Sequence, residues 1–379
     1  MTPTLTLGPI PLNIGTRERP TNAPFPDELP FTAQLDERSG VISQAFEPSV
    51  AAILDEIYAR GSQLGTPMSD YGLGKVTCED FLAFLHAALS LQDLRGMKVL
   101  EVGCGTGYLL ARLREVGAEV LGIEPGASSS VHAKSAGIRV IHEPFERVEL
   151  NDDFDLVLHT GVLEHVRAPV EFLRRQLSLL RPGGGIAFAV PDCEPALAHG
   201  DFSMFVHEHW SYFTTASIAS LVKAAGGRAN LIRSARVGGA LYVSADKAGP
   251  PARRTPPVAE TANALDAFAQ RAARGRQALA DYFAERCNAA IGVYCPGRFL
   301  NYWRLADTAR LRLFDDDIAL HGRYFPPMPI PIEPRSCLLA RPVDSLLIMS
   351  RTFGPALAST LRNNPALANC EIVTISELF

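Results

Sequence analysis

The sequence lacks the cysteine pairs that a disulfide framework or a structural zinc site would need. Its 379 residues include seven cysteines, an odd number, and no two of them stand in a C-x-x-C arrangement. Disulfide scaffolds carry even numbers of cysteines, and cysteine-based zinc sites contain closely spaced pairs. We therefore expect reduced thiols, no bound metal, and a cytoplasmic location.

The sequence also lacks an excess of basic residues and any long apolar run. Lys and Arg number 36 against 41 Asp and Glu, which gives a net charge of -5 and argues against nucleic-acid binding. The N-terminus, MTPTLTLGPIPLN, does not resemble a secretory signal, and no run approaches the roughly 20 apolar residues of a membrane span. We expect a small-molecule substrate and neither a nucleic acid nor a membrane as partner, whereas the sequence does not indicate an oligomeric state.

What is present is an ordinary globular composition, with 47% hydrophobic residues and a mean hydropathy of +0.07. The length suggests two or three domains. The first 45 residues are rich in Pro, Thr and Asn, which predicts extended segments and turns. We divide the chain into an N-terminal segment (1–75), a first α/β domain (76–247), a linker and long helix (248–286), and a smaller α/β unit (287–379).

Apolar runs alternate with helical patterns through the first α/β domain. This order predicts a Rossmann-like, mostly parallel sheet with helices on both faces, and the same alternation restarts in residues 287–379. Residues 239–247, GALYVSADK, read as a late edge strand. The other expected strands are MKVLEVG, AEVLGIEPG, GIRVIHEPF, FDLVLHT and GIAFAVPD.

A glycine loop follows the first expected strand in VLEVGCGTGYLLARL. Gly103, Gly105 and Gly107 would let the backbone turn sharply and let a ligand approach closely. The spacing G-x-G-x-G differs from the dinucleotide fingerprint G-x-G-x-x-G, which favours a nucleoside ligand without phosphate. Glu124 ends the next strand, 23 residues after Glu101, where a carboxylate can accept hydrogen bonds from both ribose hydroxyls.

The segments EVGCGTG, GIEPG, FDLVLHTGVLEHV and LRPGGGIAFAVP resemble those of class I S-adenosylmethionine-dependent methyltransferases. The resemblance covers about residues 97–245 and implies S-adenosyl-L-methionine as cofactor. It implies that Glu101, Gly103, Gly105 and Gly107 surround the methionine and ribose part of the cofactor and that Glu124 binds the ribose hydroxyls. The segment around Glu143 and Phe145 would lie beside adenine. His159 and Thr160 would line the cofactor near the substrate side.

The stretch VHEHWSYFT resembles the Y-H-E-H-x-S-Y-F-[ST] segment of sugar-nucleotide C-methyltransferases. Those enzymes methylate a carbon next to a keto group on a nucleotide-linked deoxysugar. VYCPGRFLN and FDDDIALHGRYFPPMPIPI are similar to later segments of that family. The resemblance implies that Arg298 and Tyr324 contact the substrate.

Carbon methylation requires a base that removes a proton beside a ketone, and a histidine suits this task. By the resemblance, His209 is the expected base, Glu208 orients it or binds the sugar, and His165 lies near the keto oxygen or the abstracted proton. From the triplet alone, His209 is equally a hydrogen-bonded histidine of a loop. Zinc binding by His207 and His209 is disfavoured, because residues i and i+2 share no helix face.

Three features of the sequence depart from the pattern of this family. The four-cysteine zinc domain that usually opens these proteins is missing, since only Cys78 precedes residue 100, and Val206 and Phe299 replace a tyrosine and a glycine. Tyr71 is the nearest candidate for the tyrosine that the family contributes from its N-terminal region.

Three functions follow from these patterns. The first is C-methylation of a nucleotide-activated keto-deoxysugar. The second is O- or N-methylation of another small polar metabolite on the same scaffold. The third is a binding subunit that keeps the cofactor and transfers nothing.

Overall fold

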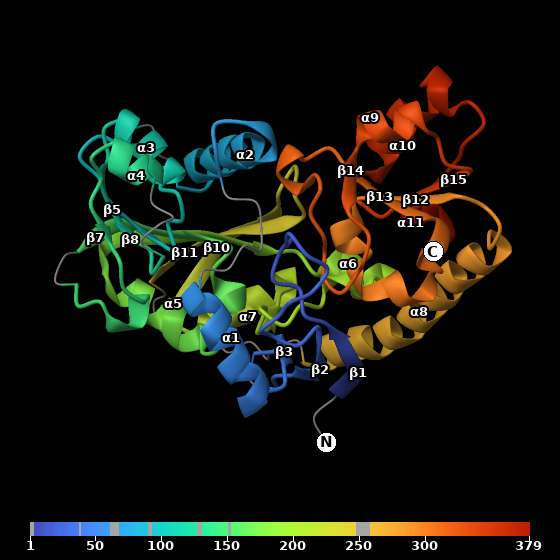
Figure 1. Ribbon diagram of the computed structural model, residues 1–379. Coiled ribbons are helices and arrows are strands. Elements are labelled where there is room, and N and C mark those ends of the chain that lie inside the picture. Colours follow the sequence, from blue (N-terminus) through green and yellow to red (C-terminus); the bar gives the residue numbers. More distant parts are fainter. Residues whose placement is uncertain are drawn as a thin grey trace.

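A computed structural model describes residues 4–37, 39–60, 68–89, 93–126, 131–150, 153–247 and 258–379. These residues form three sheets, of seven, four and five strands (Figure 1). In this view the N-terminal four-stranded sheet lies below the seven-stranded sheet, and the five-stranded sheet lies at the right-hand end of the molecule.

The central sheet has the order β10-β11-β8-β7-β4-β5-β6, and all neighbours are parallel except β11, which runs antiparallel to both β8 and β10. The predicted Rossmann-like α/β fold is therefore confirmed. The expectation of an edge strand at residues 239–247 is wrong, because the unpredicted strand β10 pairs outside it. The strands are β4 (Lys98–Val102), β5 (Glu119–Ile123), β6 (Val140–Ile141), β7 (Phe154–Thr160), β8 (Leu180–Pro191), β10 (Gly227–Ser234) and β11 (Ala240–Lys247).

Helices cover both faces of this sheet and enclose two apolar cores. Phe81 and Phe84 pack under one face with Leu109 and Leu113, while Phe172 and Leu221 contribute to the core under the other. The first face carries α2 (Gly72–Leu89), α3 (Tyr108–Glu115) and α4 (Val131–Ser135), and the second carries α5 (Pro169–Ser178) and α7 (Thr215–Ala224). The connections contain η1 (Phe145–Arg147), η2 (Leu163–His165), α6 (Glu194–His199) and η3 (Phe202–Met204).

The N-terminal segment forms an antiparallel sheet with the order β1-β2-β3-β9. Its first three strands confirm the predicted extended segments: β1 (Thr4–Pro11), β2 (Glu28–Leu35) and β3 (Ile42–Gln44). The fourth, β9 (Ser211–Tyr212), comes from the first α/β domain, directly after the H-E-H triplet. A helix that the sequence reading did not include, α1 (Pro48–Arg60), follows this sheet.

The C-terminal unit begins with the long helix α8 (Val258–Glu285), and the predicted linker 248–257 lies outside the described residues. Its sheet is entirely parallel, with the order β14-β13-β12-β15-β16. The strands are β12 (Ile291–Tyr294), β13 (Leu311–Asp315), β14 (Ile332–Pro334), β15 (Ser345–Ile348) and β16 (Glu371–Thr374). The helices are α9 (Arg335–Ala340), α10 (Gly354–Arg362) and α11 (Ile375–Leu378), with the short turns η4 (Pro296–Arg298), η5 (Leu300–Leu305), η6 (Thr308–Arg310), η7 (Ile318–Leu320) and η8 (Pro365–Leu367).

One apolar core joins the N-terminal sheet to the C-terminal unit. Phe31 of β2, Phe205, Phe268 of α8 and Val293 of β12 belong to the same buried cluster. Phe31 and Phe205 have ring centroids 5.2 Å apart, and Phe205 and Phe268 have centroids 5.6 Å apart. The loop that precedes β9 is thus held between three parts of the chain.

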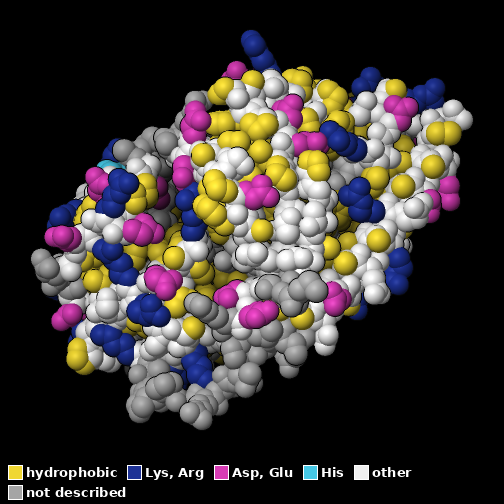
Figure 2. Space-filling model, turned by 90° about the horizontal axis from the view of Figure 1, so that it is seen from below, with side chains coloured by type: hydrophobic (Ala, Val, Ile, Leu, Met, Phe, Trp, Pro, Cys, Tyr) yellow, Lys and Arg dark blue, Asp and Glu magenta, His cyan; other side chains and the backbone are white. Residues whose placement is uncertain are grey.

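The surface carries mixed charge on the face seen from below in Figure 2. There, among the atoms that are not grey, Lys and Arg side chains alternate with Asp and Glu and neither sign gathers into a broad patch. Among the described helices, none has both the length and the apolar composition that crossing a bilayer requires.

Candidate active site

The central sheet changes winding direction between β4 and β7, and the loops after these two strands meet there. In open parallel sheets, ligands bind in the crevice beyond the carboxyl ends of the strands at this switch point. Gly103 has φ 69°, and a Cβ on it would lie 2.5 Å from Val162 Cγ2 in the loop after β7. Gly107, with φ 76°, would meet Ala133 at the same distance. Glycine is therefore required at both positions for the loops to approach.

Glu124 stands at the end of β5 and closes this loop. Its carboxylate accepts hydrogen bonds from the backbone N–H of Gly105 at 3.0 Å and of Gly126 at 2.9 Å. The side chain is half-buried, so its remaining lone pairs face the crevice edge where a ribose would lie.

Glu101, within β4, is a buried carboxyl group with an orphaned oxygen. It is 2% exposed, and its Oε2 has no hydrogen-bond partner among the described residues. Burial, with a smaller effect from the charge of Glu124, raises the pKa of Glu101 well above its usual value. A buried carboxylate is stabilised by a positive group, so the α-ammonium of a bound S-adenosylmethionine fits this position.

Two of the residues predicted to contact the cofactor have buried side chains. Phe145 is 4% exposed and packs against Phe172 with ring centroids 5.3 Å apart, so its ring belongs to the core under α5. The neighbouring Glu143 is exposed.

His159 is the second of these buried residues. It is 0% exposed, stacks on Phe188 with ring centroids 4.6 Å apart, and its Nδ1 lies 3.1 Å from Gln176 Oε1. Burial lowers the pKa of His159 to about 3. The alternating directions of side chains in β7 turn this ring into the core, whereas Thr160 is half-buried at the strand end.

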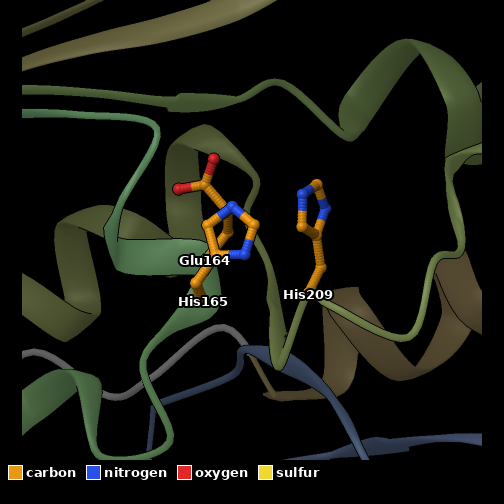
Figure 3. A group of neighbouring side chains, drawn as sticks. All are labelled: Glu164, His165 and His209. Atoms are coloured by element: carbon orange, nitrogen blue, oxygen red, sulfur yellow. The ribbon is translucent and has the colours of Figure 1, made fainter. Parts of the chain in front are cut away.

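Beside the glycine loop, two histidines and a glutamate come together from two loops (Figure 3). His165 lies in η2 after β7, and His209 lies before β9; their ring centroids are 4.8 Å apart and their planes nearly perpendicular, at 85°. One oxygen of Glu164 and one nitrogen of each ring all lie within 4.8 Å of one another. The structure therefore brings together the predicted His165 and His209, and adds Glu164, which the sequence reading did not single out.

Tyr58 of α1 fixes the orientation of His165. The Tyr58 hydroxyl donates to the backbone oxygen of Glu208 at 3.0 Å and lies 2.7 Å from His165 Nδ1, which is itself 2.9 Å from the same Glu208 oxygen. Because a carbonyl oxygen only accepts, Nδ1 carries the proton and Nε2 is left as the acceptor. Burial lowers the pKa of His165 to about 4, so the ring is neutral near pH 7.

The three residues of the H-E-H triplet point to different surroundings. His207 is 0% exposed, with Nε2 3.1 Å from the backbone oxygen of Leu29, so it is a core histidine. Glu208 has a fully buried side chain and contacts His165 through its backbone oxygen. His209 is half-buried in the cluster; burial, followed by His165 and Arg298, lowers its pKa well below the usual value.

Of the predicted substrate residues, Arg298 is the one whose charge acts on the cluster. It is exposed, follows β12, and its charge lowers the pKa of His209. Tyr324 is half-buried and its backbone pairs with Arg17 at 2.9 Å in both directions, which ties the C-terminal unit to the N-terminal segment. Tyr71 is 75% exposed at the start of α2, so the tyrosine at the cluster is Tyr58 instead.

Tyr58 had a signal in the sequence. Apolar residues at positions 50, 54 and 57 mark one face of a helix that begins at Pro48, and this pattern predicts α1. Nothing in the sequence alone places this helix beside residue 165, because the contact spans 107 positions.

A cavity of about 350 Å³ lies at the carboxyl ends of β12 and β13. Its lining includes Tyr294, Cys295, Asp315 and Asp316, with α10 on the other side. Cys295 adopts φ 62° and leads directly into η4, which ends at Arg298. The cavity and the histidine cluster are therefore connected by one short turn of chain.

Comparison with known proteins places this site in context. A family model described as "Methyltransferase domain" matches residues 76–228. The match covers less than half of the chain, and residues 76–228 resemble a methyltransferase domain. The predicted methyltransferase class agrees with this match.

Curated relatives are similar over about a quarter of this chain. The ubiquinone biosynthesis O-methyltransferase of Azorhizobium caulinodans is 39% identical over 108 residues, which is 27% of this chain and 43% of that protein. The tRNA U34 carboxymethyltransferase of Idiomarina loihiensis is 46% identical over 110 residues, 26% of this chain and 34% of that protein. The chain thus matches less than half the length of these relatives.

Among solved structures, the 1,6-didemethyltoxoflavin-N1-methyltransferase of Burkholderia thailandensis, with S-adenosylhomocysteine bound, aligns with a TM-score of 0.42 and 20% identity. The alignment covers 58% of this chain and 96% of that one.

Proposed function

We propose that this protein transfers a methyl group from S-adenosylmethionine to a carbon beside a keto group of a nucleotide-linked deoxysugar. The observation that carries the proposal is the contact of two neutral histidines, His165 and His209, at the edge of the crevice beside the glycine loop. A methylated carbon must first lose a proton, and a neutral imidazole is ready to accept it.

The cofactor is held by the loops of the switch point. Gly103, Gly105 and Gly107 allow its close approach, Glu124 accepts from the ribose hydroxyls, and Glu101 faces the ammonium group. When bound, the cofactor supplies a methyl group on a sulfonium, and its positioning against the substrate carbon governs the rate.

The protein's own residues form the nucleophile. His209 takes the proton from the carbon beside the ketone, while His165, oriented by Tyr58 and the Glu208 backbone, presents Nε2 toward the same space. The positive charge of Arg298, a residue of the C-terminal unit, disfavours protonation of His209 before the substrate binds.

The nucleotide part of the proposal rests on the C-terminal cavity. Its parallel sheet has a doubly wound order, and acidic side chains at the end of the second strand of such sheets bind ribose hydroxyls. Asp315 and Asp316 occupy this position, and the turn from Cys295 to Arg298 leads from the cavity to the cluster. A substrate with a nucleoside at one end and a keto sugar at the other fits this arrangement.

O-methylation is the second candidate, favoured by the likeness of residues in this domain to ubiquinone biosynthesis O-methyltransferases. In that reaction His209 would deprotonate a hydroxyl. The two candidates differ in one respect: only C-methylation exchanges a carbon-bound proton of the substrate with solvent.

The deciding experiment combines the purified protein, methyl-¹³C S-adenosylmethionine and a pool of nucleoside-diphosphate 4-keto-deoxysugars, with the product observed by carbon NMR. A C-methyl resonance is expected. An O-methyl resonance would replace the first candidate by the second, and bound cofactor without transfer to any member of the pool would contradict the first.

A further inference from the structure

Glu164 is a buried acid at the active-site cluster, and the proposed base chemistry gives this residue no role. Its side chain is 3% exposed, and its Oε2 has no hydrogen-bond partner among the described residues. An ionised carboxylate in such a place is costly, so the group carries a proton or faces a cation.

The geometry leaves room for one substrate atom between the three side chains. One oxygen of Glu164 and one nitrogen of each histidine lie within 4.8 Å of one another, yet no hydrogen bond joins these side chains in the described structure. Hydrogen bonds span about 2.5–3.2 Å. A substrate oxygen placed between them is thus within reach of the acid and of a ring nitrogen at once (Figure 3).

Glu164 lies close to the loop after β7 that approaches the cofactor loop. Its Oε1 lies 3.7 Å from the position of a Cβ on Gly161, an exposed residue that follows β7. Val162, the next residue, is the one that Gly103 of the cofactor loop approaches.

We propose that Glu164 is the general acid of this site, which protonates the carbonyl oxygen of the substrate while His209 removes the proton from the neighbouring carbon. The inference rests on the proposed C-methylation and deepens it. The C–H bond breaks and its proton goes to His209; its electron pair forms a C=C bond, and the carbonyl π pair takes the proton of Glu164 as an O–H bond.

The second half-reaction restores the acid. The C=C electron pair forms the new bond to the methyl carbon, while the bond from this carbon to the sulfonium sulfur breaks and its electron pair stays on the sulfur of the leaving S-adenosylhomocysteine. The O–H pair forms the carbonyl again, and its proton returns to Glu164. The imidazolium of His209 then loses its proton to solvent. During the reaction a negative Glu164 faces a positive His209, so this buried site never carries the net charge that either group alone would create.

The groups that face Glu164 are consistent with a resting proton. Tyr58 of α1, His165 and His209 are the titratable side chains next to it, Cys193 follows β8, and Arg298 approaches His209 and Cys193 from the C-terminal unit. Burial raises the pKa of Glu164 to about 8.

The first test detects the proton itself and needs no substrate. Infrared difference spectra of wild type minus Glu164→Gln are expected to show the carbonyl stretch of a neutral carboxylic acid below pH 8 and its loss above pH 8. The matched control is Glu171→Gln, which replaces an exposed glutamate of α5 and identifies the bands that any exchange of Glu for Gln produces. An ionised Glu164 near neutral pH, or a stoichiometric divalent metal that is bound by the wild type and lost in Glu164→Gln, would overturn the proposal.

The second test measures turnover with the 4-keto-deoxysugar pool. Glu164→Gln, which keeps the shape but transfers no proton, is expected to lower kcat by about 10²–10⁴-fold with little change in KM. Glu164→Asp should recover part of this loss, and α-proton exchange in deuterated water should fall in parallel. Unchanged kcat in Glu164→Gln would refute the acid role, whereas a wild type that methylates nothing in the pool would refute the substrate and leave the infrared result to decide on Glu164.

Discussion

At the scale of single residues, His209 is the side chain that the proposed reaction uses as its base. Its neutral ring contacts His165 and is held in place by a backbone N–H that donates to Val206 at 3.1 Å. Its removal deletes the proposed base and leaves the glycine loop and Glu124 untouched, because these come from other strands.

We therefore expect His209→Ala to lower kcat by about 10²–10⁴-fold and to leave cofactor affinity unchanged. Methyl transfer from ¹³C-labelled cofactor gives the first quantity and calorimetric titration with S-adenosylhomocysteine the second. His199→Ala, an exposed histidine in the last turn of α6, is the control. Equal activity of the two variants would show that the base lies elsewhere.

Tyr58 acts at the same scale through His165. Tyr58→Phe removes the hydroxyl that bridges Nδ1 and the Glu208 carbonyl, while the ring remains packed. The expected effect is a loss of about 0.5–1.5 kcal/mol in stability and a fall in kcat of roughly tenfold at unchanged KM, because His165 is then less firmly oriented.

Tyr71→Phe distinguishes this assignment from the one that the sequence favoured. Tyr71 is 75% exposed, so its hydroxyl should be dispensable for both stability and turnover. Thermal unfolding and kcat of the two variants, measured side by side, decide which tyrosine serves the site; a loss confined to Tyr71→Phe would restore the original expectation.

At the scale of elements, Glu124 links β5 to the glycine loop after β4. Glu124→Ala removes a carboxylate that accepts two backbone N–H groups and, by the proposal, the ribose hydroxyls. Hydrogen bonds to a charged group contribute about 1.5–3 kcal/mol, so the Kd for S-adenosylhomocysteine should rise by roughly 10- to 100-fold.

Glu119→Ala is the natural comparison for this variant. Glu119 opens the same strand at its other end and its side chain is exposed, so calorimetry should give the wild-type Kd. A similar loss in both variants would mean that β5 itself, rather than the carboxylate, had been disturbed.

The strands of the central sheet also show how far the sequence predicts the structure. The runs around β4, β5, β7 and β8 are apolar because both faces of these strands are buried, and they could be recognised directly. After its first position β10 contains only exposed and half-buried residues, as an edge strand can, and it was not predicted. The glycine loop was predictable because its residues are adjacent in sequence.

The cluster around His209 was only partly predictable, because its residues are far apart in sequence. Tyr58, His165 and His209 lie on separate elements, and their meeting depends on β9 joining the N-terminal sheet. His159 illustrates the same limit, since its place after a strand of the expected kind suggested the crevice, whereas the pleat of β7 turned it into the core.

At the scale of the whole molecule, histidines that stay neutral in the folded state link stability to pH. His159 under α5, His165 at the cluster and His207 between the N-terminal sheet and the shared core are buried, and burial lowers their pKa values to about 3, 4 and 4. In the unfolded chain each titrates near 6.5. Below pH 6.5 the unfolded state therefore binds more protons than the folded state, and stability falls as the pH falls toward 4.

We expect the free energy of unfolding to be nearly independent of these groups above pH 6.5 and to decrease between pH 6.5 and pH 4 by up to about 1.4 kcal/mol per pH unit for each of them. Urea unfolding across this range measures the slope. His207→Gln keeps an N–H donor for the Leu29 carbonyl but does not titrate, so it should reduce the slope by the share of one histidine. His199→Ala, which removes an exposed histidine, is the control for the substitution itself. Because His207 supports the loop that carries His209, an unchanged slope in His207→Gln would mean that this loop opens in acid before the molecule unfolds.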